Sequence, residues 1–228
     1  MDLGGVSAIA WFAIGSLFAM SSEPMPKVAA TSRDRRVAGF VLFLSFLPVN
    51  FSGALGLLLC GFYLAASSSR DAVERRLAIV MIALTGPLIW GRFMLALMGP
   101  FLLGLDARMA GLLAGAPVQG NVVAMRDGGS LYVALGCSSV HNMSLAVLLF
   151  VTLTQQLRLR YTPLLVATGI GAALSMAAVN VLRLATLARF PQHFDLVHTG
   201  WGGTMFGLFS FVAAAAMIMG GIRAQLSR

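Results

Sequence analysis

Long, nearly uncharged apolar stretches alternate with short clusters of Lys and Arg along the sequence, and this pattern constrains the fold more than any other feature. Only 11% of the residues are charged and 58% are hydrophobic, whereas soluble domains contain about a quarter charged residues. The apolar stretches reach about 20 residues or more, enough for an α-helix to cross a hydrocarbon core of roughly 30 Å. The sequence therefore predicts an all-α polytopic membrane protein, with residues 1–228 forming a single integral membrane domain.

The basic clusters predict which loops face the cytoplasm, because short loops rich in Lys and Arg stay on that side. The clusters are Lys27 with Arg33, Arg35 and Arg36; Arg70 with Arg75 and Arg76; Arg158 with Arg160; and Arg223 with Arg228. They place the N-terminus outside. The net charge of +8 forms no basic face interleaved with aromatic residues, so we expect the lipid bilayer as a partner and no nucleic acid.

About seven transmembrane helices follow from this charge pattern. The stretch 37–66 has cytoplasmic charge at both ends, so it either crosses twice, turning at Pro48–Asn50, or forms a re-entrant hairpin. A kink is expected at Gly86–Pro87, and Gly203 and Gly207 have the small-xxx-small spacing that lets membrane helices pack closely. The expected spans are 3–20, two within 37–66, 77–98, 139–156, 163–188 and 201–221.

Residues 102–136 differ in composition from the rest and predict an extracytoplasmic insertion. Within it, 106–114 has the pattern of a short amphipathic helix. Two strands, 118–124 and 131–135, are expected to form a β-hairpin around the turn at 126–129. This hairpin would bring Cys137 to the membrane surface.

Three reactive side chains fall at the outer ends of the expected helices. Cys137 begins an inward helix, Arg183 lies near the end of an outward helix, and His198 precedes the last helix. They are 46 and 15 residues apart, so only the helix topology would bring them together. Their convergence on one membrane face is the main functional signal and predicts an active site facing the periplasm or exterior.

Each of these residue types suits a chemical role. A helix N-terminus favours the thiolate of Cys137, and a histidine transfers protons near neutral pH. A cation within a membrane helix, such as Arg183, is a candidate functional residue. Asn180 lies three residues earlier on the same helical face, where it would orient Arg183 or bind a substrate peptide group.

Other interpretations of these residues stay open. Both Cys137 and Cys60 are expected to be free thiols, and Cys60 fits a buried hydrophobic role better. His141, four residues after Cys137, competes with His198 as the base, as does His193. Arg92 would bind a substrate carboxylate or extend its charge to the membrane surface.

The segments around these residues resemble the exosortase/archaeosortase family of membrane transpeptidases. Residues 136–139 (GCSS) are similar to that family's nucleophile motif, 180–183 (NVLR) to its Asn-x-x-Arg motif, and 198–201 (HTGW) to its histidine motif. The lead-in at 112–135 is also similar, so the resemblance covers about 105–207. Ser139 replaces a common glycine and the loop from Arg183 to His198 is short, which suggests a divergent bacterial branch. The resemblance implies location in a bacterial cytoplasmic (inner) membrane.

The resemblance implies cleavage of C-terminal sorting signals on exported proteins, each made of a short motif, a transmembrane helix and a basic tail. It implies Cys137 as nucleophile, Arg183 as the group that stabilises the tetrahedral intermediate, and His198 as the proton carrier. The new C-terminus would pass through an acyl-thioester to an unknown acceptor. Asn180, Ser138 and Arg92 are candidate substrate-binding residues, and no metal or cofactor is expected.

A competing function is a small membrane transporter or a non-catalytic partner of polysaccharide export. Arg92 and Arg183 would then line an anion pathway. The charged groups gather at one membrane face instead of the midplane, and no inverted repeat is visible in the sequence. These two features favour the enzyme.

Overall fold

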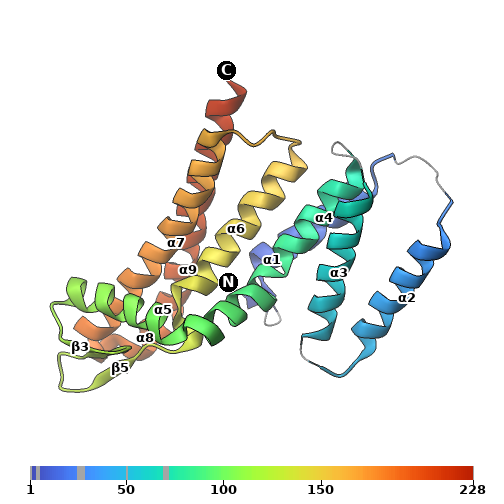
Figure 1. The fold of residues 1–228 in the computed structure, drawn as a ribbon. Helices are drawn as coiled ribbons and strands as arrows, with labels where there is room; N and C mark the ends of the chain where they lie inside the picture. The colour runs from blue at the N-terminus through green and yellow to red at the C-terminus, as the bar shows by residue number, and fades with distance from the viewer. Residues whose placement is uncertain (1, 4–5, 25–28, 50, 69–71, 228) are drawn as a thin grey trace. The chain divides into compact units, whose positions relative to one another are not determined.

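The computed structural model describes residues 2–3, 6–24, 29–49, 51–68 and 72–227. Sequence predictions that involve Lys27, Asn50, Arg70 and Arg228 lie outside these residues. The described chain is mostly helical, as predicted (Figure 1). It divides into two compact units. One comprises 2–90 and 148–160, and the other comprises 91–147 and 161–228.

The unit formed by 2–90 and 148–160 is built from short helices. Its elements are β1 (Asp2–Leu3), β2 (Val6–Ser7), α1 (Ala8–Ser21), α2 (Ser32–Phe46), α3 (Ser52–Ser67), α4 (Val73–Leu84), the π-helical turn η1 (Gly86–Trp90) and the second half of α6 (Ser139–Gln156). Ser7 caps α1, and Thr31 and Asp34 form a capping box on α2. α3 packs against both α2 and α4, and α1 packs against α4. Regular α-helix stops just before the predicted kink, because Pro87 cannot donate a backbone hydrogen bond.

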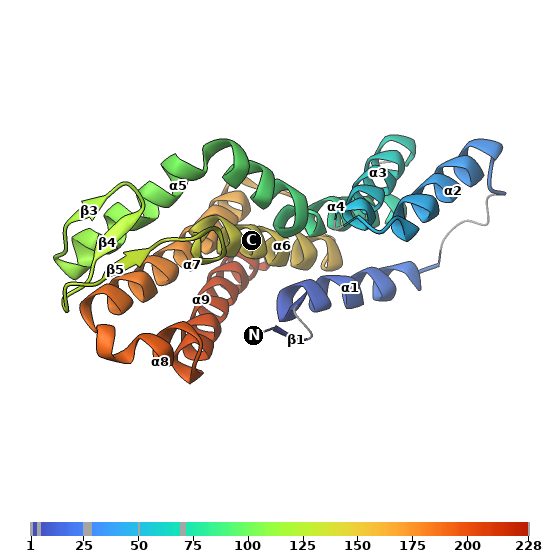
Figure 2. The same cartoon turned by 90° about the horizontal axis from the view of Figure 1, so that it is seen from below.

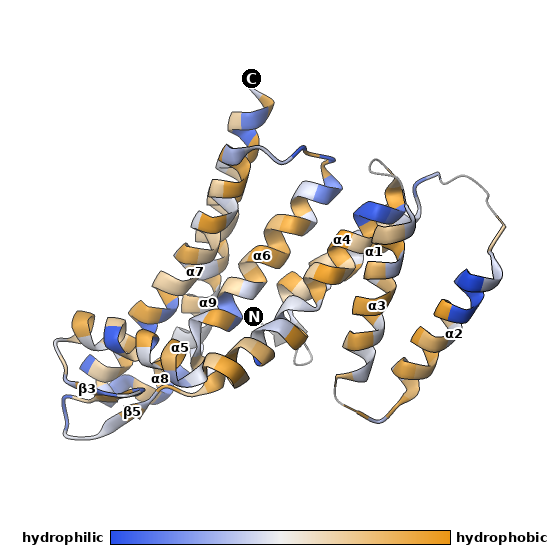
Figure 3. Ribbon diagram, viewed as in Figure 1, coloured by the Kyte–Doolittle hydropathy of each residue, from blue (hydrophilic) through white to orange (hydrophobic). Residues whose placement is uncertain are grey.

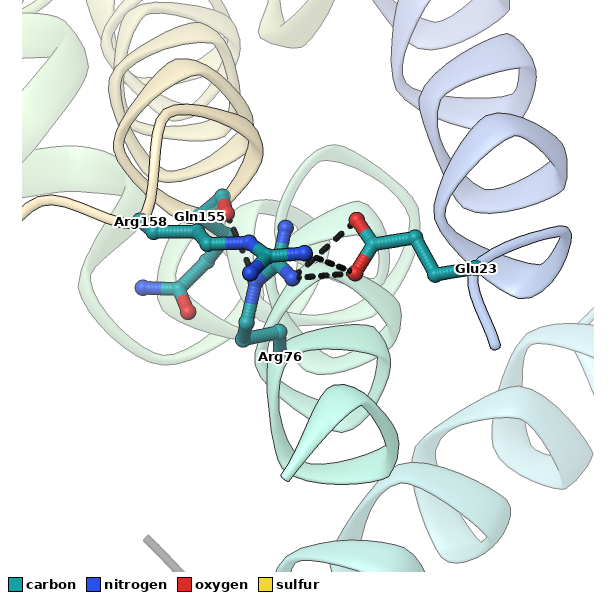
Figure 4. Close-up of polar contacts among 4 residues, drawn as sticks. All are labelled: Glu23, Arg76, Gln155 and Arg158. Carbon is teal, nitrogen blue, oxygen red and sulfur yellow. Dashed lines mark hydrogen bonds and ion pairs between the residues drawn. The ribbon is translucent and has the colours of Figure 1, made fainter. Parts of the chain in front are cut away.

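Arg76 is buried at the start of this unit's α4 instead of lying in a loop, where the charge pattern had placed it. Its Nη1 donates to both carboxylate oxygens of Glu23, at 3.1 and 2.9 Å, and its Nε donates to the carbonyl of Gln155 at 2.8 Å (Figure 4). Arg158 also pairs with Glu23, at 2.6 Å. The Arg76 hydrogen bond, aided by both positive charges, holds the pKa of Glu23 below its ordinary value. Glu23 thus joins the end of α1 to α4 and to the end of α6.

This ion-pair cluster predicts a pH-dependent stability. A carboxyl with a lowered pKa stabilises the fold above its ordinary pKa, near 4.5, and loses that contribution as the pH falls through the lowered value. Glu23→Gln should therefore lower the thermal midpoint of the purified protein at pH 7, and the difference from the wild type should shrink as the pH falls below the ordinary pKa of 4.5 and through the lowered one.

Glu74→Gln is the matched control, since Glu74 lies in the first turn of the same α4. It should change the midpoint less at pH 7. Equal losses in the two variants would contradict a specific role for Glu23.

The unit formed by 91–147 and 161–228 carries the candidate site. Its elements are α5 (Gly91–Ala114), β3 (Val118–Gln119), β4 (Val122–Ala124), β5 (Ser130–Tyr132), the 3₁₀ turn η2 (Leu135–Cys137), the first half of α6, α7 (Pro163–Arg189), the 3₁₀ turn η3 (Pro191–His193), α8 (Phe194–His198) and α9 (Trp201–Leu226). α7 and α9 run side by side (Figures 1 and 2). Gly221 of α9 allows close contact with Thr168, and Gly171 of α7 with Met217.

The predicted insertion differs from the structure in three respects. The expected strand 131–135 is shorter, because β5 ends at Tyr132 and Leu135 belongs to η2. Residues 106–114 are not a separate amphipathic helix but the end of the 24-residue α5, which is kinked at Met98 just before Pro100. The expected strand 118–124 is divided into β3 and β4, because Gly120 turns the chain with a φ of 60°. The result is a three-stranded antiparallel sheet in the order β3-β4-β5.

The sheet packs between the C-terminal part of α5 and α7 (Figure 2). Gly111 makes this approach possible, because a Cβ there would lie 2.2 Å from a methyl group of Val118. The buried core of this unit contains Ala107 and Ala110 from α5, Val123, Leu131 and Val133 from the sheet region, Val181 and Leu184 from α7, and Val197 from α8. Cys137 packs against this core, and the η2 turn that carries it contacts α5.

Among the residues that the structure describes, three helical segments are long and apolar enough to cross a membrane: Val73–Ala114, Pro163–Arg189 and Trp201–Leu226. Many large apolar side chains are exposed, including Phe46 at 85%, Leu112 at 76% and Trp201 at 68%, which is unusual for a protein surrounded by water. Figure 3 shows the predominance of apolar residues on these helices. The fold is therefore compatible with a membrane protein. α1 and α3, of 14 and 16 residues, are shorter than the roughly 20 residues that a perpendicular crossing needs, so the count of seven spans stays a prediction.

Candidate functional site

Asn180 of α7 holds the Cys137 turn. Its side-chain amide nitrogen donates to the carbonyl of Cys137 at 2.7 Å and to the hydroxyl of Ser139 at 3.3 Å. Asn180 is only 4% exposed, so these hydrogen bonds form in a largely water-free environment. The amide nitrogen predicted to bind substrate or orient Arg183 is therefore engaged in positioning Cys137 and the start of α6.

Arg183 lies one helical turn after Asn180 and holds the His198 turn. Its Nε donates to the carbonyl of Val197 at 3.3 Å, and its Nη2 donates to the carbonyl of His198 at 2.8 Å. These carbonyls are at the C-terminal end of α8, where helical carbonyls lack partners and a cation is favourable. The guanidinium is thus directed into the protein, toward α8.

His198 is the last residue of α8 and its ring is partly enclosed. The Phe194 ring lies 5.0 Å from it, between centroids, at a tilt of 51°. The Nδ1 atom of His198 is buried and has no hydrogen-bond partner among the described residues. A buried polar atom without a partner is uncommon and costs free energy, so it marks a position where stability is not the only constraint.

Glycines at the start of α9 keep the His198 turn compact. A Cβ on Gly202 would lie 2.9 Å from the carbonyl oxygen of Leu196, and one on Gly200 would lie 2.8 Å from the same oxygen. Gly203, which was predicted to mediate helix packing, also faces this turn, with the carbonyl of Val197 3.1 Å from its Cβ position. A larger residue at position 203 would displace the carbonyls of Val197 and His198 that Arg183 binds, and one at position 200 or 202 would displace the preceding carbonyl of Leu196.

Gly202→Ala should therefore destabilise the protein by about 1–3 kcal/mol, the usual cost of overpacking, despite alanine's better helix propensity. Gly220→Ala is the matched control on the same helix, because its Cβ position has no neighbour within 4 Å. That variant should be neutral or slightly stabilised. Thermal unfolding of the two purified variants tests this, and a Gly202→Ala variant as stable as Gly220→Ala would contradict the tight turn.

Asp106 of α5 is a buried residue of this site that the sequence interpretation did not single out. It is 7% exposed, and its carboxylate accepts the backbone N–H of Ser139 at 2.8 Å. A carboxylate at the first turn of a helix satisfies a free N–H and favours the helix dipole. One signal was available in the sequence, since Asp106 is the sole acidic residue between Glu74 and Asp127.

Ser138 has no exposed surface, and its hydroxyl accepts the backbone N–H of Val140 at 3.2 Å. It therefore supports the first turn of α6. The Ser138 side chain would have to move to make the predicted contact with substrate.

Arg92 is exposed in the first turn of α5 and makes no hydrogen bond or ion pair with the residues that the structure describes. His141 and His193 are both exposed, and Cys60 lies in the other unit.

Within one unit, α7 thus contacts the backbone carbonyl of Cys137 through Asn180 and the backbone carbonyls of Val197 and His198 through Arg183. Among the described residues, no group of three His, Cys, Asp or Glu side chains could hold a metal ion. No known protein family, curated protein or solved structure matches the chain significantly.

Proposed function

We propose that the chain is a membrane-embedded cysteine transpeptidase of the exosortase type, acting on C-terminal sorting signals of exported proteins. One observation carries the proposal: α7 holds the Cys137 turn through Asn180 and the His198 turn through Arg183. Asn180 and Arg183 are three positions apart, which corresponds to a rise of about 4.5 Å along the helix. A nucleophile, a cation and a proton carrier are thereby tied to one short stretch of α7.

In the first step, the Cys137 thiolate attacks the scissile peptide carbonyl of the substrate, forming a carbon–sulfur bond and a tetrahedral oxyanion. Arg183 has five N–H groups and uses two of them on the carbonyls of α8. The remaining three are the proposed donors to the oxyanion. A guanidinium already held by two hydrogen bonds needs little reorganisation as the negative charge develops.

In the second step, the peptide carbon–nitrogen bond breaks and His198 gives a proton to the departing amine. The substrate remains on Cys137 as an acyl-thioester. An acceptor amine, or water, then attacks the thioester, His198 takes up the proton, and the Cys137 thiolate is restored. No redox step or added cofactor is needed for this sequence.

Asp106 and Asn180 support the nucleophile without taking part in the bond changes. Asp106 binds the N–H of Ser139 and Asn180 binds the carbonyl of Cys137, so the peptide units on both sides of Ser138 are held. A nucleophile on a fixed backbone stays close to its attacking geometry, which contributes to rate.

The proposal includes the membrane arrangement expected from the charge pattern. Seven crossings in an inner membrane would place 102–136, Cys137, Arg183 and His198 at the periplasmic or outer face, and the Arg158–Arg160 loop inside. Sorting signals consist of a short motif, a transmembrane helix and a basic tail, so the substrate helix would lie in the bilayer beside the enzyme.

The test is to co-express the chain in a bacterium with an exported protein that carries such a C-terminal signal, taken from the same genome. Loss of the C-terminal helix and tail, measured by intact mass of the exported protein, supports the proposal. A substrate that keeps its C-terminus in the presence of an abundant, correctly inserted enzyme contradicts it.

The alternative of an anion-conducting transporter receives less support from the geometry. In that case Arg183 would present its guanidinium to a pathway, whereas two of its donors are used by α8. Arg92, the second arginine of that pathway, is exposed, and an exposed arginine on a membrane helix commonly extends to the membrane surface.

A further inference from the structure

α2 combines a strongly basic first turn with an apolar remainder. Arg33, Arg35 and Arg36 are all exposed at its start, and Phe40, Leu42, Phe43 and Phe46 are exposed further along. Figure 3 shows the same division, with hydrophilic residues at the beginning of α2 and apolar residues after them. This distribution is typical of helices that contact both the headgroups and the acyl chains of a bilayer.

A hollow of about 500 Å³ opens on this part of the unit, between α2 and α3. Val37, Phe40 and Val41 of α2 line it, with Leu59 and Tyr63 of α3 opposite. Arg33 and Arg36 are the two charged residues in the lining. Its volume is in the range of small-molecule sites, which are mostly apolar with a few placed polar groups.

The charged groups around the hollow, Arg33 and Arg36 against the single carboxylate of Asp34, carry a net positive charge. The guanidinium of Arg33 lies over the Tyr63 ring, 5.4 Å from its centroid, which fixes its position. Arg36 makes one weak contact, from Nε to the carbonyl of Ser32 at 3.4 Å. The neighbouring acid, Asp34, accepts hydrogen bonds from Thr31 and from the Tyr63 hydroxyl. Both arginines therefore keep N–H donors for an anion.

We propose that this hollow binds an anionic phospholipid, with the phosphate between Arg33 and Arg36 and one acyl chain against Phe40, Val41 and Leu59. A free phosphate would satisfy the arginines but not the apolar lining, and a zwitterionic lipid would leave the positive charge uncompensated. A basic cluster beside a membrane helix attracts anionic lipids by the same electrostatics. The site belongs to the unit without Cys137 and is independent of the proposed catalytic activity.

The full-length protein in detergent, titrated with phosphatidylglycerol or with phosphatidylethanolamine of the same chain length and examined by native mass spectrometry, tests the site. The wild type should retain one phosphatidylglycerol in preference to phosphatidylethanolamine. The double variant Arg33→Gln/Arg36→Gln should bind phosphatidylglycerol at least about tenfold more weakly. Arg35→Gln removes one charge from the same helix outside the hollow and should bind nearly as the wild type does.

Three results would overturn the proposal. Equal retention of the two lipids would indicate ordinary lipid around the protein, and an Arg35→Gln loss as large as that of the double variant would indicate diffuse attraction. Displacement of phosphatidylglycerol by millimolar inorganic phosphate would indicate a simple anion site. A thermal midpoint measured for each variant establishes that the comparisons are made on folded protein.

Discussion

Replacing Cys137 with serine is expected to abolish substrate processing, with a loss of at least about a thousandfold, while the protein inserts and accumulates normally. Serine is close to cysteine in size but provides almost no anion near neutral pH, so the proposed attack on the peptide carbonyl fails. The Asn180 contact is made to the Cys137 backbone carbonyl, so it is retained in the variant. The measurement is the intact mass of the co-expressed exported protein.

Two further variants make this result specific. Cys137→Ala should be as inactive as Cys137→Ser, whereas Cys60→Ala should process substrate normally, because Cys60 lies in the other unit. Thermal midpoints of the variants should stay close to that of the wild type. Processing that survives in Cys137→Ala would make Cys137 a packing residue of the core and remove the basis of the proposed function.

Arg183→Lys should lower processing by at least about a hundredfold even though the positive charge is kept. A planar guanidinium reaches the carbonyls of both Val197 and His198, and a single lysine ammonium cannot reproduce that fork while also serving an oxyanion. The His198 turn should therefore loosen at the same time as the oxyanion loses its donor. Processing rates of the substrate, normalised to enzyme abundance, measure the loss.

The alkylation rate of Cys137 by a small thiol reagent separates these two effects, since alkylation forms no oxyanion. A rate close to that of the wild type in Arg183→Lys, together with lost processing, indicates the oxyanion role. A processing rate near the wild-type value in this variant would show that neither role depends on the guanidinium.

The choice of proton carrier is tested by a pair of histidine variants in the same assay. His198→Ala should lose processing but keep alkylation of Cys137, and His141→Ala should cost little, because His141 is exposed on α6 whereas His198 is held at the end of α8. An inactive His141→Ala beside an active His198→Ala would assign the proton transfer to the helix neighbour of Cys137.

Local sequence patterns were sufficient for the features that depend on neighbouring residues. Apolar stretches predicted the helices, and the boundaries 139–156 agree with α6. The spacing of Asn180 and Arg183 predicted one helical face, because residues three apart adjoin on any α-helix. The motifs at Cys137 and His198 predicted the candidate nucleophile and base, because the reactivity of a thiol or an imidazole belongs to the residue type itself.

Only the tertiary structure decided what those side chains contact. Asp106 and Ser139 are 33 residues apart, and the hydrogen bond between them exists because α5 and the start of α6 meet in space. Arg183 likewise binds carbonyls of α8 because α7 and α8 meet in space. Ser138 is buried because other segments pack around it. Helical periodicity and charge placement act over a few residues, whereas packing among distant segments depends on the whole core. The sequence by itself thus determined which groups are available, and the tertiary structure decided how they are held.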